Sequence, residues 1–141
     1  INQYKEHREM YLKQLQVMKT QLTALLEPYR GAPVISFHNA FSYFYEQLGL
    51  KEAGLIEEHA GVEPAASHLA ELVQQAKAAQ VRVVIAEPQL SDQAAQVIAK
   101  ETGAKVVKLD PLGGAGGERT SYIELQLANG RALAEALGSG Y

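Results

Sequence analysis

The chain has 141 residues, which is enough for one domain with a real hydrophobic core. Its formal net charge of −3 argues against nucleic acid or an anionic membrane as partner, and no apolar run approaches the roughly 20 residues of a membrane span. The absence of cysteine excludes a disulfide scaffold, a thiolate metal site and a cysteine nucleophile.

Residues 1–27 carry the longest periodic pattern. Its apolar positions, at helical spacing, are Tyr4, Tyr11, Leu15, Met18, Leu22 and Leu25. The stripe predicts a helix roughly 40 Å long that ends at Pro28. We expect its apolar face to pack on a core; a coiled coil, or a rigid strut to another domain, is the alternative. Because Ile1 already lies in this pattern, we also expect a fragment or a processed chain.

Short apolar runs then alternate with helical patterns. Strands are predicted at 34–37, 50–57, 81–86 and 104–109, of which the second is the weakest. Helices are predicted at 39–48, 64–79, 92–102 and 119–137. This alternation is typical of an α/β fold in which a four-stranded parallel sheet is flanked by helices.

Three polar residues directly follow predicted strands: His38, Glu87 and Asp110. Because ligands of such folds bind beyond the carboxyl ends of the strands, we expect the three at one edge of the sheet. One imidazole and one or two carboxylates suit zinc or manganese. The simpler alternative is a histidine held by backbone groups and two turn carboxylates. The aromatic segment 41–45 would pack behind the imidazole.

Other polar features are weaker candidates for a site. The glycine-rich loop at 113–118 lacks the Lys-Ser/Thr of a Walker loop, and Arg119 stands where a dinucleotide motif needs its third glycine. Ser121 has no GxSxG context, so a hydrolase nucleophile is not supported. Three further histidines are predicted to lie on the surface: His7, His59 and His68.

Four stretches carry a resemblance to a known family. Taken in order, SFHNAFSYFYEQLGL, GVEPAASHLAELV, VVIAEPQ and LDPLG resemble the C-terminal lobe of the metal-binding proteins of zinc and manganese ABC transporters, and most closely the zinc-uptake type. The resemblance covers residues 30–137, and residues 1–27 resemble the long helix between the family's two lobes. It implies a linker helix at 1–28, a metal-binding α/β lobe at 29–141, and an N-terminal lobe that this chain lacks.

The resemblance also implies roles for the three strand-end residues. His38 matches the metal-binding histidine of the FHxAFxYF motif, and Asp110 matches a carboxylate that is a ligand in many members and a weak ligand or a neighbour of the metal in others. Glu87 matches the EPQ glutamate, which would support the site from behind the ligands. Manganese members tend to carry Glu at the position of His38, which favours Zn²⁺ over Mn²⁺ as cargo.

The function implied by the resemblance is capture of Zn²⁺ outside the cytoplasm, in a periplasmic or lipid-anchored protein, and delivery to an ABC transporter permease. Two further histidines would come from the missing lobe, so this chain would hold about half of the site. Such a protein is not an enzyme. A manganese or iron transporter component and a metal-binding adhesin are alternatives within the family; a nucleotide-binding module and a small metallohydrolase are alternatives of other classes.

Overall fold

The computed structural model describes residues 2–57, 61–114 and 121–139. Its strands are β1 (Pro33–Ser36), β2 (Lys51–Leu55), β3 (Val83–Ala86) and β4 (Lys105–Lys108). All neighbouring strands are parallel, in the spatial order β2-β1-β3-β4. The predicted α/β class with a four-stranded parallel sheet is therefore confirmed.

Within these ranges five α-helices accompany the sheet: α1 (Asn2–Leu26), α2 (Ser42–Leu48), α3 (Ala66–Ala79), α4 (Gln93–Thr102) and α5 (Tyr122–Gly138). Two short 3-10 helices, η1 (Glu27–Tyr29) and η2 (Asn39–Phe41), precede β1 and α2. The helix predicted at 39–48 is thus split into η2 and α2. α3 and α5 begin later than predicted, and the hydroxyl oxygen of Ser121 caps α5 by accepting a hydrogen bond from the backbone N–H of Glu124 at 3.2 Å.

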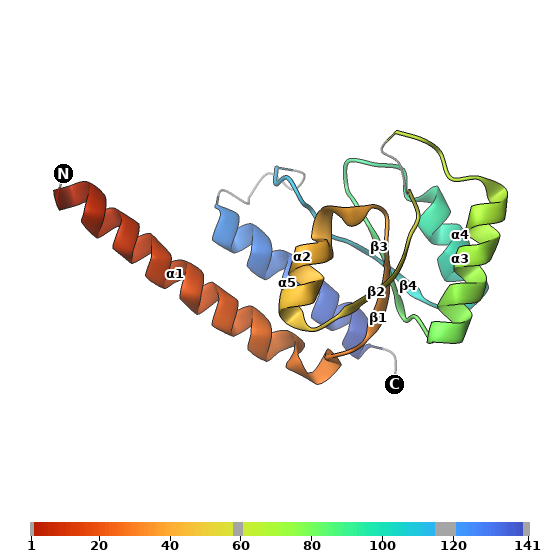
Figure 1. Cartoon of the computed structure of the whole chain (residues 1–141), viewed down its shortest axis with the longest axis horizontal. Helices are drawn as coiled ribbons and strands as arrows, with labels where there is room; N and C mark the ends of the chain where they lie inside the picture. Colours follow the sequence, from red (N-terminus) through yellow and green to blue (C-terminus); the bar gives the residue numbers. More distant parts are fainter. Residues whose placement is uncertain (1, 58–60, 115–120, 140–141) are drawn as a thin grey trace.

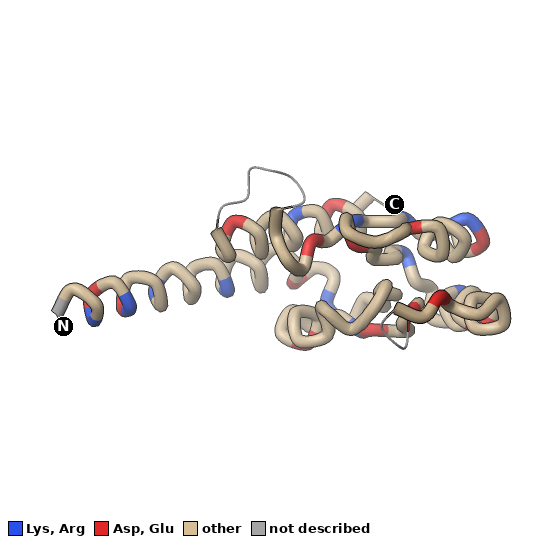
Figure 2. Tube along the Cα trace, turned by 90° about the horizontal axis from the view of Figure 1, so that it is seen from above, with Lys and Arg blue, Asp and Glu red and all other residues tan. Residues whose placement is uncertain are grey.

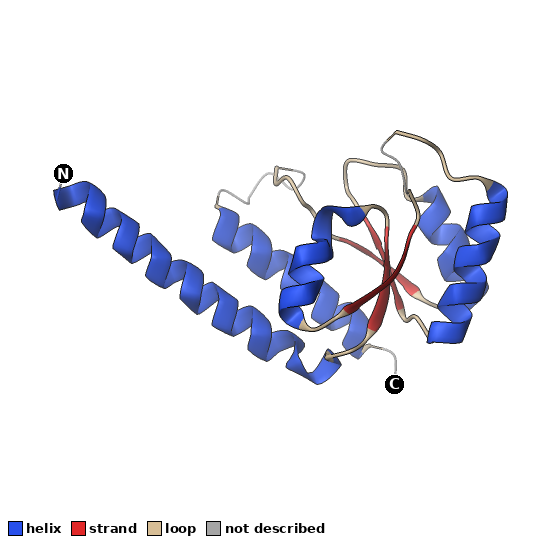
Figure 3. Cartoon of the chain, viewed as in Figure 1, coloured by secondary structure: helices blue, strands red, loops and turns tan. Residues whose placement is uncertain are grey.

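The sheet is buried on both faces. Helices α1, α2 and α5 cover one face, and α3 and α4 cover the other (Figure 3). Alternate residues of β1 and β3 enter the two cores: Val34, Val83 and Ile85 on the first side, and Ile35, Val84 and Ala86 on the second. A strand that is buried on both faces has a continuous apolar run, and β3 with its four buried residues is such a strand.

Burial of the apolar stripe on α1 is confined to its middle, and Leu25 near the C-terminal end is exposed. Met18 and Leu22 pack in the core, whereas Tyr4 and Tyr11 are exposed where α1 projects beyond the lobe (Figure 1). The expectation of a core-facing helix is therefore right for the second half of α1 and wrong for the first. α1 and α5 approach each other closely at Gly130, where a Cβ atom would overlap the Leu22 side chain.

Charges are interspersed over the molecule. Figure 2 shows Lys and Arg mixed with Asp and Glu along the chain, without either sign gathered on one element. In the part of the chain that the structure describes, none of the helices combines the length and the apolar character that crossing a membrane would require.

Candidate metal centre

The three residues singled out from the sequence lie at the carboxyl edge of the sheet. His38 follows β1, Glu87 follows β3 and Asp110 follows β4. Because β3 lies between β1 and β4, the loop after β3 is flanked by the two other loops. Ligands of parallel α/β folds bind at this edge.

His38 and Glu87 are in direct contact. Nδ1 of the imidazole lies 2.5 Å from Oε1 of Glu87. This is a close polar contact between the imidazole and the carboxylate. The imidazole keeps 31% of its side-chain surface exposed, whereas Glu87 keeps 4%. With Nδ1 turned towards the carboxylate, Nε2 is the nitrogen that remains for an ion.

Glu87 interacts electrostatically with three other residues of this edge. Burial raises the pKa of its carboxyl, because the charged form loses hydration. The adjacent His38 acts in the opposite direction, while the negative charges of Glu57 and Asp110 raise the pKa of Glu87 further. Residues from the ends of all four strands therefore share one electrostatic environment, and a cation placed there would relieve the repulsion between the carboxylates.

Asp110 is buried and held by several hydrogen bonds. Its Oδ1 accepts from Nε2 of Gln89 at 2.7 Å and from the backbone N–H groups of Leu112 and Gly113 at 3.0 and 2.9 Å. This oxygen shapes the loop after β4. Because Oδ1 is engaged in this way, Asp110 would hold a metal ion through one carboxylate oxygen rather than two.

The structure brings His38 and Glu87 together, and Asp110 is linked to them less directly. Asp110 is hydrogen-bonded to Gln89 in the loop after β3, and its negative charge raises the pKa of Glu87. Within residues 2–57, 61–114 and 121–139, no three His, Asp or Glu side chains gather closely enough to hold a metal ion by themselves. These residues present one supported, partly exposed imidazole rather than a complete set of ligands.

Two residues of this edge were not identified from the sequence. Glu57 follows β2 closely, and the strand-end rule that singled out the other three residues would have found it if the predicted strand had ended earlier. Gln89 lies two residues after Glu87, but its contact with Asp110 joins residues 21 positions apart. No local pattern in the sequence signals that contact.

The aromatic segment supports the edge differently from the expectation. The ring beside the His38 imidazole is Phe37, with ring centroids 6.3 Å apart. Phe41, Phe44 and Tyr45 contact one another instead, and they lie in and against the core that α1, α2 and α5 form. These rings therefore stabilise η2 and α2. His38 directly precedes η2, so this packing helps to fix its position.

The remaining histidines lie away from this arrangement or outside the described residues. His7 is exposed on α1. His68 was expected on the surface but is half-buried, and its Nε2 lies 2.9 Å from the carbonyl oxygen of Leu55, which joins α3 to β2. His59, and most of the glycine-rich loop at 113–118, fall outside the residues that the structure describes.

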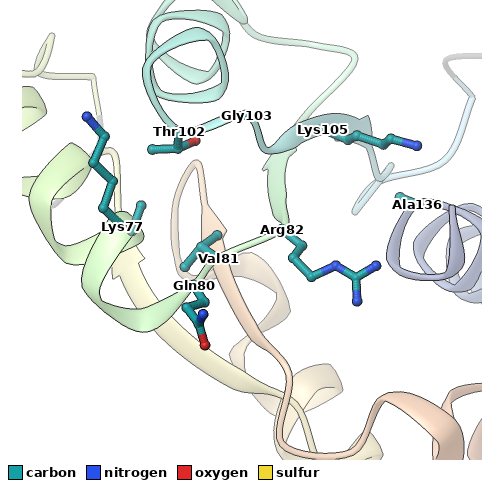
Figure 4. Close-up of a pocket in the computed structure, with 9 residues that line it drawn as sticks. Lys77, Gln80, Val81, Arg82, Thr102, Gly103, Lys105 and Ala136 are labelled. Atoms are coloured by element: carbon teal, nitrogen blue, oxygen red, sulfur yellow. The ribbon is translucent and has the colours of Figure 1, made fainter. Parts of the chain in front are cut away.

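A cavity of about 400 Å³ lies at the opposite edge, near the amino ends of β3 and β4. Three cationic side chains line it, but Lys77 points away from Arg82 (Figure 4). Nζ of Lys105 donates to the carbonyl and hydroxyl oxygens of Ser139 at 2.8 and 2.5 Å. Because these cations do not converge on one point, we assign no ligand to this cavity.

Comparison with known proteins agrees with the chemistry of the carboxyl edge. Residues 2–136 match the family model described as zinc-uptake complex component A periplasmic. Among curated relatives, the high-affinity zinc uptake system protein ZnuA of Brucella abortus (strain 2308) is 30% identical over 111 residues, which cover 79% of this chain and 33% of that protein.

Solved structures share the fold over nearly the whole chain. A crystal structure of ZnuA superposes with a TM-score of 0.81 at 30% identity, covering 96% of this chain and 50% of the other. The laminin-binding protein Lmb of Streptococcus agalactiae superposes with a TM-score of 0.82 at 30% identity, covering 95% of this chain and 52% of the other. This chain thus spans a third of the curated relative and about half of the solved chains.

Proposed function

Because the chain belongs to the zinc-uptake complex component A family of metal-binding solute-binding proteins, we propose that it captures Zn²⁺ outside the cytoplasm as part of an ABC transport system. In this proposal the protein passes the ion to a membrane permease. The chain binds and releases its cargo and makes or breaks no covalent bond.

The observation that carries the proposal is the pairing of His38 with the buried Glu87. A metal ion binds a neutral imidazole through the lone pair of one ring nitrogen. The contact with Glu87 holds Nδ1 and keeps the ring in one orientation, which leaves Nε2 for the ion. A partly exposed imidazole with a buried carboxylate behind it is the arrangement that zinc-binding histidines commonly have.

We propose that Asp110 is the second ligand, through one oxygen of its carboxylate. In this reading residues 1–28 form a linker helix and residues 29–141 form one metal-binding lobe of a larger protein, whose other part supplies the remaining ligands. Two ligands that face solvent bind zinc far more weakly than four preorganised ones. The chain by itself should therefore bind zinc weakly and with one ion per chain.

Zinc is the proposed cargo because imidazole nitrogen suits Zn²⁺, whereas Mn²⁺ favours sites made of oxygen ligands. Competition between the two ions for the chain tests this preference. If Mn²⁺ displaced Zn²⁺ at comparable concentrations, the cargo would be manganese.

Zinc titration of the chain in the presence of a chromophoric chelator tests the function. His38→Ala should abolish the zinc that the unaltered chain takes from the chelator, and its melting temperature without metal should change little because the ring is partly exposed. His7→Ala is the matched control, since His7 is exposed on α1 far along the chain from the edge. Zinc binding that survives His38→Ala would refute the proposal.

Lmb, which this chain resembles at 30% identity, is described as a bifunctional protein with adhesin and metal transporting activity. This likeness supports a second, surface-binding role as a subsidiary proposal. Binding of the chain to immobilised laminin would test it, and an absence of binding both with and without zinc would exclude it.

A further inference from the structure

The loop after β3 contacts both proposed ligands with side chains two residues apart. Glu87 touches the imidazole of His38, which follows β1, at 2.5 Å. Gln89 donates from Nε2 to Oδ1 of Asp110, which follows β4, at 2.7 Å. We infer that Gln89 is a positioning residue that, together with Glu87, sets the separation and orientation of the two ligands; this inference rests on the proposed function.

The segment Glu87–Gln89 is well placed for this role. It extends from β3, which is paired with β1 on one side and β4 on the other. Pro88 restricts the backbone between the two side chains, and the N–H of Leu90 donates to the carbonyl oxygen of Glu87 at 3.2 Å, which closes the turn. A short, constrained turn on a central strand couples the positions of its two contacts.

Gln89 acts on the side chain of Asp110 and not on its backbone. Among the described residues three donors converge on Oδ1, and two of them, the N–H groups of Leu112 and Gly113, belong to the loop that Asp110 itself forms. The third donor, the Gln89 amide, comes from the turn after β3, so this hydrogen bond connects the Asp110 loop to β3. The turn after β3 therefore acts together with the N–H groups of the loop to fix the orientation of the Asp110 carboxylate.

The side chain of Gln89 carries no charge. The negative charges of Glu57 and Asp110 already repel that of Glu87 at this edge, and a further carboxylate would add to the repulsion. A cationic side chain would reduce the negative charge that attracts a metal ion. An amide donor fixes Asp110 without changing the charge of the site.

A zinc titration of the chain followed by NMR tests the inference. The ring signals of His38 report the first ligand, and the backbone amide signals of Leu112 and Gly113, which donate to Asp110, report the second. Gln89→Leu removes the amide at similar size, and its exposed position keeps the core intact. Gln74→Leu, at an exposed position on α3, is the matched control.

In the unaltered chain and in Gln74→Leu, the His38 and loop signals should move together, with one midpoint. In Gln89→Leu the midpoint of the His38 signals should shift to zinc concentrations on the order of tenfold higher, and the Leu112 and Gly113 signals should no longer follow them. A Gln89→Leu chain with the same midpoint and the same loop response as the control would overturn the inference and leave the proposed function standing. If the His38 signals of the unaltered chain did not respond to zinc, the proposed function would fail, and the inference with it.

Discussion

The side chain of Asn129 pairs with the backbone of Asp110 on both of its polar groups. Oδ1 of Asn129 accepts from the Asp110 N–H at 2.9 Å, and Nδ2 donates to the Asp110 carbonyl oxygen at 2.8 Å. Asn129 lies on α5 and is buried, so this amide takes the place of a neighbouring strand where the chain leaves β4. The carboxyl edge of the sheet, with the proposed metal ligands, is therefore attached to α5, which also packs against α1.

Asn129→Leu should lower the free energy of unfolding by roughly 2–4 kcal/mol, because it leaves a buried N–H and a buried carbonyl without their partner. Urea unfolding followed by circular dichroism measures this change. Gln126→Leu, at a half-buried position one turn earlier on the same helix, is the control and should lower stability by less than Asn129→Leu. Equal effects of the two substitutions would show that the pairing contributes nothing.

The effect of Gly130→Ala on stability should change sign when Leu22 is also replaced by alanine. Gly130→Ala places a Cβ against the Leu22 side chain and should cost about 1–3 kcal/mol by overpacking the contact between α1 and α5. In a Leu22→Ala background the same substitution should stabilise the protein, since the space is free and alanine favours a helix over glycine by about 1 kcal/mol. Chemical denaturation of the unaltered protein, the two single variants and the double variant measures the four free energies of unfolding. If Gly130→Ala destabilised the protein in both backgrounds, the close approach of Gly130 to Leu22 would be contradicted.

Ser36 and Tyr45 form a buried hydroxyl pair beneath the metal edge. The Ser36 hydroxyl donates to the Tyr45 hydroxyl oxygen at 2.9 Å, and both residues are almost fully buried. Tyr45→Phe should cost about 1–3 kcal/mol, because it leaves the serine hydroxyl without its acceptor. Adding Ser36→Ala should recover part of this loss. A double variant whose loss equals the sum of the two single losses would contradict the coupling.

Glu87→Gln should stabilise the metal-free protein increasingly as the pH rises. Burial raises the pKa of Glu87 above its ordinary value of 4.5, so the folded state holds the proton more tightly than the unfolded state. Between 4.5 and the raised pKa, the stability of the unaltered protein therefore falls as the pH rises, and above that window the loss is complete. Glutamine, which does not titrate, lacks this loss.

Melting temperatures of the two proteins from pH 4 to pH 8, measured with a chelator present, test the sign. The difference in favour of Glu87→Gln should grow across the window and then level off. Glu71→Gln, at an exposed position on α3, corrects for the general effect of removing a negative charge. A difference that is constant with pH, or that shrinks as the pH rises, would show that burial does not dominate at Glu87.

The sequence predicted the strands and helices well because their signals are local. Apolar runs marked the strands, and Gly49 and Gly103, both in the left-handed conformation that glycine adopts easily, marked the ends of α2 and α4. The stripe on α1 predicted a helix correctly, but it did not show which half of the helix is covered. Burial of Met18 and exposure of Tyr4 depend on how far the lobe extends along α1, and this is a property of the packing.

The sequence by itself determined the α/β class, the parallel sheet and the three strand-end residues, because alternating short-range patterns and the rule of carboxyl-end ligands are enough for these. Only the tertiary structure decided how those residues interact. The contact of His38 with Glu87 and the tie from Gln89 to Asp110 depend on β3 lying between β1 and β4. Strand order follows from how the helices pack on the two faces, so it joins residues that are distant in the chain and leaves no local mark in the sequence.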